Sequence, residues 1–207
     1  MVRPYAVALV LLALVPAVAE AEETRVSPAV QRLLDAKKAL HWNAARPGTT
    51  ERYGHAEALV AATPDAVRRV ALDFEHYHEL NRKFTGARVV AKKDGVTDVY
   101  MKLPVKIGPF TLDQWEIMRF GPDAAAPGGG FVIEGRGIQG SMKKGHLVIS
   151  VTPVGERHTL LAIDLLLVPR FYAPRSMVEE ELRDGALDLV NGMKTRAQGW
   201  VGPVVAL

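Results

Sequence analysis

The sequence contains no cysteine among its 207 residues. This absence excludes a disulfide framework, a lipoprotein anchor, a thiolate nucleophile and any metal site with cysteine ligands. The sequence also lacks a dense run of Lys or Arg, and its 26 basic and 23 acidic residues give a net charge of only +3. That excess is too mild to indicate a nucleic-acid partner, and it leaves loose attraction to an anionic membrane surface open.

Motifs of common catalytic sites are missing as well. The sequence has no nucleophile elbow, no phosphate-binding loop and no arrangement typical of a Ser/His/Asp triad. The three glycines at 128–130 lack the strand–helix context of a nucleotide loop and are interpreted as a flexible hairpin. His76 and His78 are two positions apart, which on a helix directs them to different sides, and no third ligand lies nearby. We therefore predict no catalytic motif, no metal site and no cofactor.

Long apolar runs are absent except near the N-terminus. There, Arg3 precedes an apolar stretch from Tyr5 to Val18, and Ala19-Glu20-Ala21 supplies the small residues that a signal peptidase recognises. The stretch is shorter than the roughly 20 apolar residues that a membrane-spanning helix needs. Residues 1–21 are therefore predicted to be a signal peptide that is cleaved near Ala21, and we expect the protein to be periplasmic or secreted. Cleavage leaves 186 residues, enough for one domain with a sizeable core.

Residues 22–50 are predicted to form an N-terminal helix and a linker. Ser27 followed by Pro28 is typical of a helix start, and apolar residues keep a helical spacing up to about Trp42. The segment 46–50 contains Pro and Gly and breaks this pattern. Because a single helix is marginal in water, we expect this one to pack on the main domain.

The main domain, residues 51–207, combines a series of β-rich runs with helices before and after them. The predicted elements are a strand at 53–62, helices at 63–72 and 74–80, strands at 87–92, 96–103, 112–120, 131–137, 141–152 and 158–168, and a helix at 174–200. Six consecutive strands with helices only before and after them indicate an α+β fold with an antiparallel sheet. The last helix carries an apolar stripe and is the only large cover for one sheet face. A strongly curved sheet wrapped on one long helix leaves a cavity between the two.

Four short motifs of this domain occur in an order and spacing that resemble a known family. They are Thr63-Pro64 to Val70, Asp73 to Tyr77 as a D-x-x-x-Y turn, Val99 to Pro104 with Asp113 to Trp115, and Leu167 to Pro174 before the last helix. Together they resemble the START-like polyketide cyclase/dehydrase and coenzyme-Q-binding domains of the SRPBCC (Bet v 1-like) superfamily. The resemblance spans roughly residues 51–200.

This resemblance implies a helix-grip fold, in which a curved antiparallel sheet wraps the long C-terminal helix and encloses a ligand cavity. It implies binding of lipids, sterols, quinones, polyketides or similar apolar molecules. It carries no universal catalytic motif, and it gives Asp73 and Tyr77 structural roles. We therefore expect a monomer that binds or transfers a hydrophobic small molecule, with transient membrane contact left open.

Two other functions stay open. One is a cyclase, aromatase or dehydratase that acts on a hydrophobic substrate in the same cavity. This alternative would require a cavity carboxylate or histidine with a displaced pKa. The other is an interaction module in which residues 22–50 recruit a partner.

The predicted ligand-binding residues lie on the strands, on the last helix and at the junction between them. The apolar ones that are expected to face inward are Met101, Leu103, Met118, Phe131, Leu189 and Met193. Glu116 either lies in the cavity or forms a cross-strand ion pair on the solvated face. Asp164 interrupts an apolar run and either meets the ligand or pairs with an Arg or Lys at the rim. Phe171 and Tyr172, placed between two prolines, are predicted to belong to a portal or a membrane contact.

Two glycines interrupt the last helix near its apolar stripe. Gly185 and Gly192 each cost about 1 kcal/mol of helix stability relative to alanine. They either leave space for a ligand or a hinge, or they allow close packing between the helix and its neighbours. The sequence leaves both interpretations open.

Overall fold

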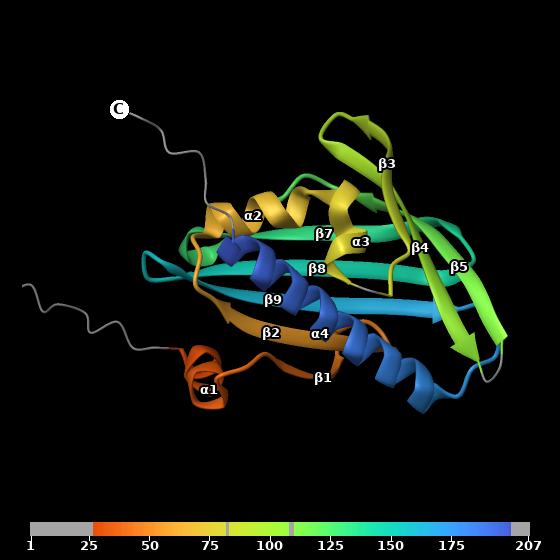
Figure 1. Cartoon of the computed structure of the whole chain (residues 1–207), viewed down its shortest axis with the longest axis horizontal. Helices are drawn as coiled ribbons and strands as arrows, with labels where there is room; N and C mark the ends of the chain where they lie inside the picture. The colour runs from red at the N-terminus through yellow and green to blue at the C-terminus, as the bar shows by residue number, and fades with distance from the viewer. Residues whose placement is uncertain (1–26, 82, 108–109, 200–207) are drawn as a thin grey trace, which may run out of the picture.

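The computed structural model describes residues 27–81, 83–107 and 110–199. They form one nine-stranded antiparallel sheet that curves around a long C-terminal helix (Figure 1). The predicted α+β helix-grip fold is therefore confirmed. The expected signal peptide, residues 1–21, lies outside the described residues. Within the described ranges, no helix is long and apolar enough to cross a membrane.

The elements along the chain are α1 (Pro28–Ala36), β1 (Leu40–Ala45), β2 (Arg52–Val60), α2 (Pro64–Leu72), η1 (Phe74–His76), α3 (Tyr77–Leu80), β3 (Gly86–Lys93), β4 (Val96–Ile107), β5 (Phe110–Phe120), β6 (Ala124–Ala126), η2 (Pro127–Gly129), β7 (Gly130–Gly140), β8 (Met142–Val154), β9 (His158–Pro169) and α4 (Arg175–Gly199). The predicted helices and strands occur in the expected order, and the structure adds β1, the short strand β6 and the 3-10 turn η2, which were not predicted. The strand order is β1-β2-β9-β8-β7-β5-β4-β3, and β6 pairs with β7 off this path. The chain therefore forms a meander from β3 to β9, and the last strand lies next to β2.

Two helix starts form as the sequence predicts. The hydroxyl of Ser27 accepts a hydrogen bond from the backbone of Val30 at the start of α1, and Thr63 does the same for Ala66 at the start of α2. In both helices a proline occupies the first turn, where the missing N–H would have had no partner within the helix. These short caps are local, which is why the sequence alone specifies them.

The segment after α1 differs from the sequence prediction. We predicted a helix up to about Trp42, but α1 ends at Ala36, and Lys37 adopts a left-handed conformation with φ of 55°. From Leu40 the chain becomes β1, which pairs antiparallel with β2 and places Trp42 opposite His55. Pairing with the free edge of β2 satisfies the backbone groups of this segment, and a local apolar spacing carries no information on that partner.

Helix α4 packs closely on the inner face of the sheet because β2 presents small residues there. Gly54, Ala56 and Ala58 are buried, and a Cβ atom at position 54 would overlap the backbone of Leu182. The buried residues of α4 form one stripe: Leu182, Gly185, Ala186, Leu189, Val190, Met193 and Ala197. This stripe and the inner sheet residues make a single core, with the pocket at one part of it.

Candidate ligand pocket

The core contains a pocket between β4, β5, β8, β9 and the last helix. Its lining consists mostly of apolar and aromatic side chains: Tyr77, Phe84, Met101, Leu103, Gln114, Trp115, Glu116, Met118, Met142, Leu147, Leu165, Leu167 and Leu189. Glu116 is the only carboxyl group among them. An apolar wall with few polar groups is typical of small-molecule sites in proteins.

The pocket is nearly filled by its own side chains. The space open to the centre of a water molecule is about 20 Å³, room for about one water. Three methionines, Met101, Met118 and Met142, contribute to the wall. Methionine has three rotatable bonds and fills irregular space, so these side chains can change rotamer to accommodate a larger ligand. A lipid-sized ligand therefore requires the pocket to expand.

Glu116 lies on the inner face of β5, between the buried residues Gln114 and Met118. Its residue surface is only 7% exposed, and its Oε2 atom is buried with no hydrogen-bond partner among the described residues. Burial disfavours the charged form and raises the pKa of this carboxyl to about 7. The sequence allowed Glu116 either in the cavity or in a cross-strand ion pair on the solvated face, and the structure places it in the pocket wall.

Two glycines make room for this carboxyl group. A Cβ atom at Gly137 on β7 would overlap Oε1 of Glu116, and one at Gly145 on β8 would overlap both carboxyl oxygens. Any side chain at either position would displace the carboxyl. We refer to the space formed by Gly137 and Gly145 as the glycine niche. Glycine inside a strand often marks such a close approach, so Gly137 and Gly145 are a sequence signal for this niche.

The structure brings together five of the predicted ligand-binding residues. Met101, Leu103, Glu116, Met118 and Leu189 all line the pocket. Two others are buried elsewhere in the core: Phe131 and Met193 face inward but lie outside the pocket wall.

Phe171 and Tyr172 lie apart from the pocket, in an outer hollow at the junction of β9 and α4. The hollow measures about 380 Å³ and is lined by Thr50, Glu51, Arg52, Leu166, Val168, Pro169, Phe171, Tyr172, Ala173, Arg175, Val178, Glu179 and Leu182. Tyr172 is 93% exposed. Leu165 and Leu167 line the pocket whereas Leu166 and Val168 line the hollow, so the same stretch of β9 separates the two spaces.

Asp164 belongs to a polar cluster beside β1 and does not line the pocket. Its Oδ1 atom lies 2.7 Å from Nδ1 of His55, and its Oδ2 atom lies 3.0 Å from the guanidinium of Arg46. His55 also stacks against Trp42, with ring centroids 4.4 Å apart. Nearby, the buried carboxylate of Glu57 accepts from Arg32 of α1. These contacts correspond to the ion-pair alternative for Asp164, and they connect α1 and the residue after β1 with β2 and β9.

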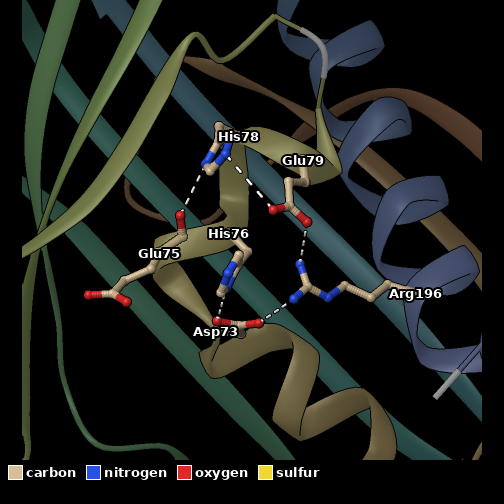
Figure 2. A network of polar contacts seen from close by, with 6 residues as sticks. All are labelled: Asp73, Glu75, His76, His78, Glu79 and Arg196. Atoms are coloured by element: carbon tan, nitrogen blue, oxygen red, sulfur yellow. Dashed lines mark hydrogen bonds and ion pairs between the residues drawn. The ribbon is translucent and has the colours of Figure 1, made fainter. Parts of the chain in front are cut away.

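The two neighbouring histidines make separate contacts (Figure 2). Nδ1 of His76 lies 2.6 Å from Asp73, while Nδ1 of His78 lies 3.0 Å from the carbonyl oxygen of Glu75. Arg196 of α4 binds the other oxygen of Asp73 at 2.6 Å, and it also reaches Glu79. Within the described part of the chain, no group of three or more His, Asp or Glu residues is placed to hold a metal ion.

These contacts give Asp73 and Tyr77 clear packing roles. Asp73 connects the end of α2 with Arg196 on α4. Tyr77 is fully buried, and its hydroxyl donates to the carbonyl oxygen of Ala71. Burial raises the pKa of Tyr77, so the hydroxyl stays protonated.

A curved antiparallel sheet closed on one long helix, with an apolar pocket between them, is also the architecture of several solved structures. The chain has the helix-grip fold of START-like domains. The STAR-related lipid transfer protein of Xanthomonas axonopodis is similar, with a TM-score of 0.65 and 10% identity over 79% of this chain and 96% of that one. A START superfamily protein of Mycobacterium smegmatis is also similar, with a TM-score of 0.55 and 22% identity over 70% of this chain and 95% of that one.

An enzyme has the same fold. The Zhui aromatase/cyclase of Streptomyces sp. R1128 gives a TM-score of 0.53 at 14% identity, covering 75% of this chain and 99% of that one. Sequence comparison finds no matching protein-family model and no matching curated protein. At these identities the likeness establishes the START-like fold, and the function has to be argued from the pocket.

Sequence reasoning missed eight residues of the wall in this START-like pocket. They are Tyr77, Phe84, Gln114, Trp115, Met142, Leu147, Leu165 and Leu167. For Gln114 a signal existed, since it alternates with Glu116 and Met118 on one strand. Phe84 lies between α3 and β3, where no periodicity indicates the direction of a side chain.

Proposed function

We propose that this chain binds a hydrophobic small molecule in the pocket and carries it through an aqueous compartment. The observation that supports this function best is the apolar, methionine-containing pocket enclosed by the sheet and α4. A START-like fold with such a pocket can shield an apolar molecule from water. Binding would shift side chains of the pocket wall, because the pocket is nearly filled without a ligand.

Pyrene tests the proposal directly, because it is uncharged, apolar and fluorescent. Leu103 is half-buried at the pocket wall, so Leu103→Trp should block the pocket without overfilling the deep core. The wild type should bind pyrene, and this variant should lose at least about tenfold in affinity, equivalent to about 1.4 kcal/mol. Leu112→Trp is the matched control, because Leu112 is exposed on β5 and lies outside the pocket wall. Equal binding by both variants would place the pyrene site elsewhere.

One observation favours a second function, a cyclase- or dehydratase-type enzyme in the same pocket. Glu116 has its pKa raised to about 7, a value suited to general acid–base catalysis near neutral pH. A simple test uses the apolar 1,3-diketone dodecane-2,4-dione and follows deuterium exchange at the carbon between its carbonyl groups. An enzyme should accelerate this exchange, and Glu116→Gln should abolish the acceleration while pyrene still binds. A pure binding protein should show no acceleration.

We also propose that binding takes place outside the cytoplasm, on the basis of the sequence from Arg3 to Ala21. N-terminal sequencing of the mature protein should begin at Glu22 or within a few residues of it. Recovery of the intact chain with Met1 from the cytoplasm would contradict export.

A further inference from the structure

We propose that Glu116 recognises the polar end of the ligand, so that the pocket selects an uncharged hydrophobic molecule with a carbonyl-type oxygen, such as a ketone, an ester or a quinone. This inference rests on the proposed binding function and narrows it to one chemical class. It depends on the position of the carboxyl group, on its missing partner and on the lack of other charges in the described pocket wall.

The carboxyl group is held at a fixed place in the pocket wall. Glu116 extends from β5 across to the glycine niche on β7 and β8, where Gly137 and Gly145 leave space for both oxygens. Side chains on either side along β5, Gln114 and Met118, are themselves buried and limit its movement. The carboxyl is therefore positioned by the sheet before any ligand arrives.

One oxygen of this group has no partner in the described structure. Oε2 of Glu116 is buried and makes no hydrogen bond among the described residues. A buried polar group without a hydrogen bond destabilises a protein by about 1–3 kcal/mol. A ligand that enters the pocket with a polar atom would supply the missing bond, and this explains why a carboxyl is tolerated in an apolar wall.

No charged side chain other than Glu116 belongs to the described pocket wall, so burial alone favours the neutral form of the carboxyl. Tyr77 is the only other titratable group in the described wall, and its hydroxyl is already bonded to Ala71. Several charged residues on or beside the neighbouring strands lie outside this wall and form ion pairs: Lys102 with Asp113, Asp98 with Arg119, Glu134 with Arg136 and His146, and Lys144 with Glu51. From α4, only the uncharged Leu189 belongs to the described wall.

A neutral carboxyl donates a hydrogen bond through its O–H, and a carbonyl oxygen is the matching acceptor. A carboxylate ligand would bring an unpaired negative charge beside Glu116 into an apolar wall, which is costly. An ammonium ligand would form an ion pair there, but both charges would first lose their water. The favoured occupant is therefore uncharged and offers an acceptor.

Four pyrenes of similar size separate these possibilities: pyrene, 1-acetylpyrene, 1-pyrenecarboxylate and 1-pyrenemethylamine. About two pH units below the pKa of about 7, the wild type should bind 1-acetylpyrene roughly threefold to tenfold more tightly than pyrene, the range expected for one hydrogen bond. The carboxylate probe should bind most weakly. About two units above that pKa, the preference for 1-acetylpyrene should disappear, because the carboxylate has no proton to donate.

Two variants of Glu116 complete the test. Glu116→Leu should lose the preference for 1-acetylpyrene over pyrene at every pH, and this ratio of two affinities within one variant can be read whatever its affinity for pyrene itself. Glu116→Gln keeps a donor in its amide group, so its preference should persist and should not depend on pH. Both variants remove an unpaired carboxyl from the core, so they should fold.

Specific results would overturn the inference. The inference is wrong if the wild type binds pyrene and 1-acetylpyrene with equal affinity, or if it binds the amine or the carboxylate probe most tightly. It is also wrong if Glu116→Leu keeps the preference for 1-acetylpyrene over pyrene. If pyrene itself does not bind to the wild type, the proposed binding function fails and the inference fails with it. If pyrene binds but the preference is absent, only the role of Glu116 is wrong.

Discussion

His55 and Asp164 are directly opposite each other on β2 and β9, and Nδ1 of His55 lies 2.7 Å from Oδ1 of Asp164. The pair is mostly shielded from water, with the Asp164 side chain only 13% exposed, and Arg46 binds the second oxygen. One carboxylate thus holds the loop after β1 against the strand pair that closes the sheet. This relationship accounts for the acidic residue inside an otherwise apolar strand.

We predict that Asp164→Ala lowers the free energy of unfolding by about 1–3 kcal/mol, because it leaves His55 and Arg46 without their partner in a poorly hydrated place. Urea unfolding measures the change. Asp113→Ala is the control, since Asp113 pairs with Lys102 but is 64% exposed. A surface pair of this kind should contribute no more than about 1 kcal/mol. Equal effects of the two substitutions would contradict a stabilising role for the His55–Asp164 pair.

The two glycines of α4 should respond differently to alanine. A Cβ at Gly192 would overlap the backbone of Leu80, which cannot move without shifting α3, whereas a Cβ at Gly185 would lie 3.2 Å from the flexible end of Leu165. Alanine improves helix stability by about 1 kcal/mol at either site. Gly185→Ala should therefore be nearly neutral, and Gly192→Ala should destabilise the fold by about 1–3 kcal/mol. Thermal unfolding compares them, and similar melting temperatures would argue against close packing at Gly192.

A third prediction concerns the contacts shown in Figure 2. The carboxylate of Asp73 accepts from Nδ1 of His76 and raises the pKa of this histidine above its ordinary value of 6.5. A raised pKa means that the stabilising contribution is complete below pH 6.5 and is lost as the pH rises through the higher value of the folded state. NMR titration of the imidazole should show a lower pKa for His76 in Asp73→Asn. Glu75→Gln is the control and should leave the titration of His76 unchanged.

Much of the fold could be predicted because its signals are local or periodic. The caps at Ser27 and Thr63 depend on neighbouring residues, and the buried stripe of α4 follows from spacing of three or four. β1 was not predicted, because its stability comes from pairing with β2, the next strand along the chain, at the edge of the sheet. Its local spacing was compatible with a helix, and the pairing across the loop between the two strands decided the outcome.

The sequence could predict which side chains face the interior, but not which of them line the pocket. Alternation along β5 indicates that Glu116 and Met118 share a face, and both line the pocket. The same reasoning predicts that Phe131 and Met193 face inward, and both do. Whether an inward-facing residue lines the pocket depends on its position along the strand or helix and on strand register. That register is a property of the assembled strands. The glycine niche likewise becomes visible only when β5, β7 and β8 lie side by side.

The last prediction concerns entry of the ligand beside Phe171 and Tyr172. Tyr172 is almost fully exposed and Phe171 is half-buried at the outer hollow, so neither is part of the deep core. β9 separates this hollow from the pocket, so entry here requires movement of residues 170–174 and the first turn of α4. Replacing both aromatic residues with serine should slow the uptake of pyrene from phosphatidylcholine vesicles by severalfold, because an apolar contact with the vesicle surface is lost.

The melting temperature distinguishes two causes of slower uptake, the loss of an apolar contact with the vesicle and a less stable fold. It should change little in the double variant, because Tyr172 is almost fully exposed and the half-buried Phe171 lies at the outer hollow, outside the deep core. Substitutions at such surface positions usually shift stability by no more than about 0.5 kcal/mol. Val90→Ser is the control, because Val90 is an exposed apolar residue on β3, outside the hollow, and its loss should leave uptake unchanged. A melting temperature that falls together with uptake would show that the aromatic residues support the fold. Unchanged uptake in a stable double variant would place the portal at another part of the pocket, with the half-buried Leu103 and Trp115 as the next residues to test.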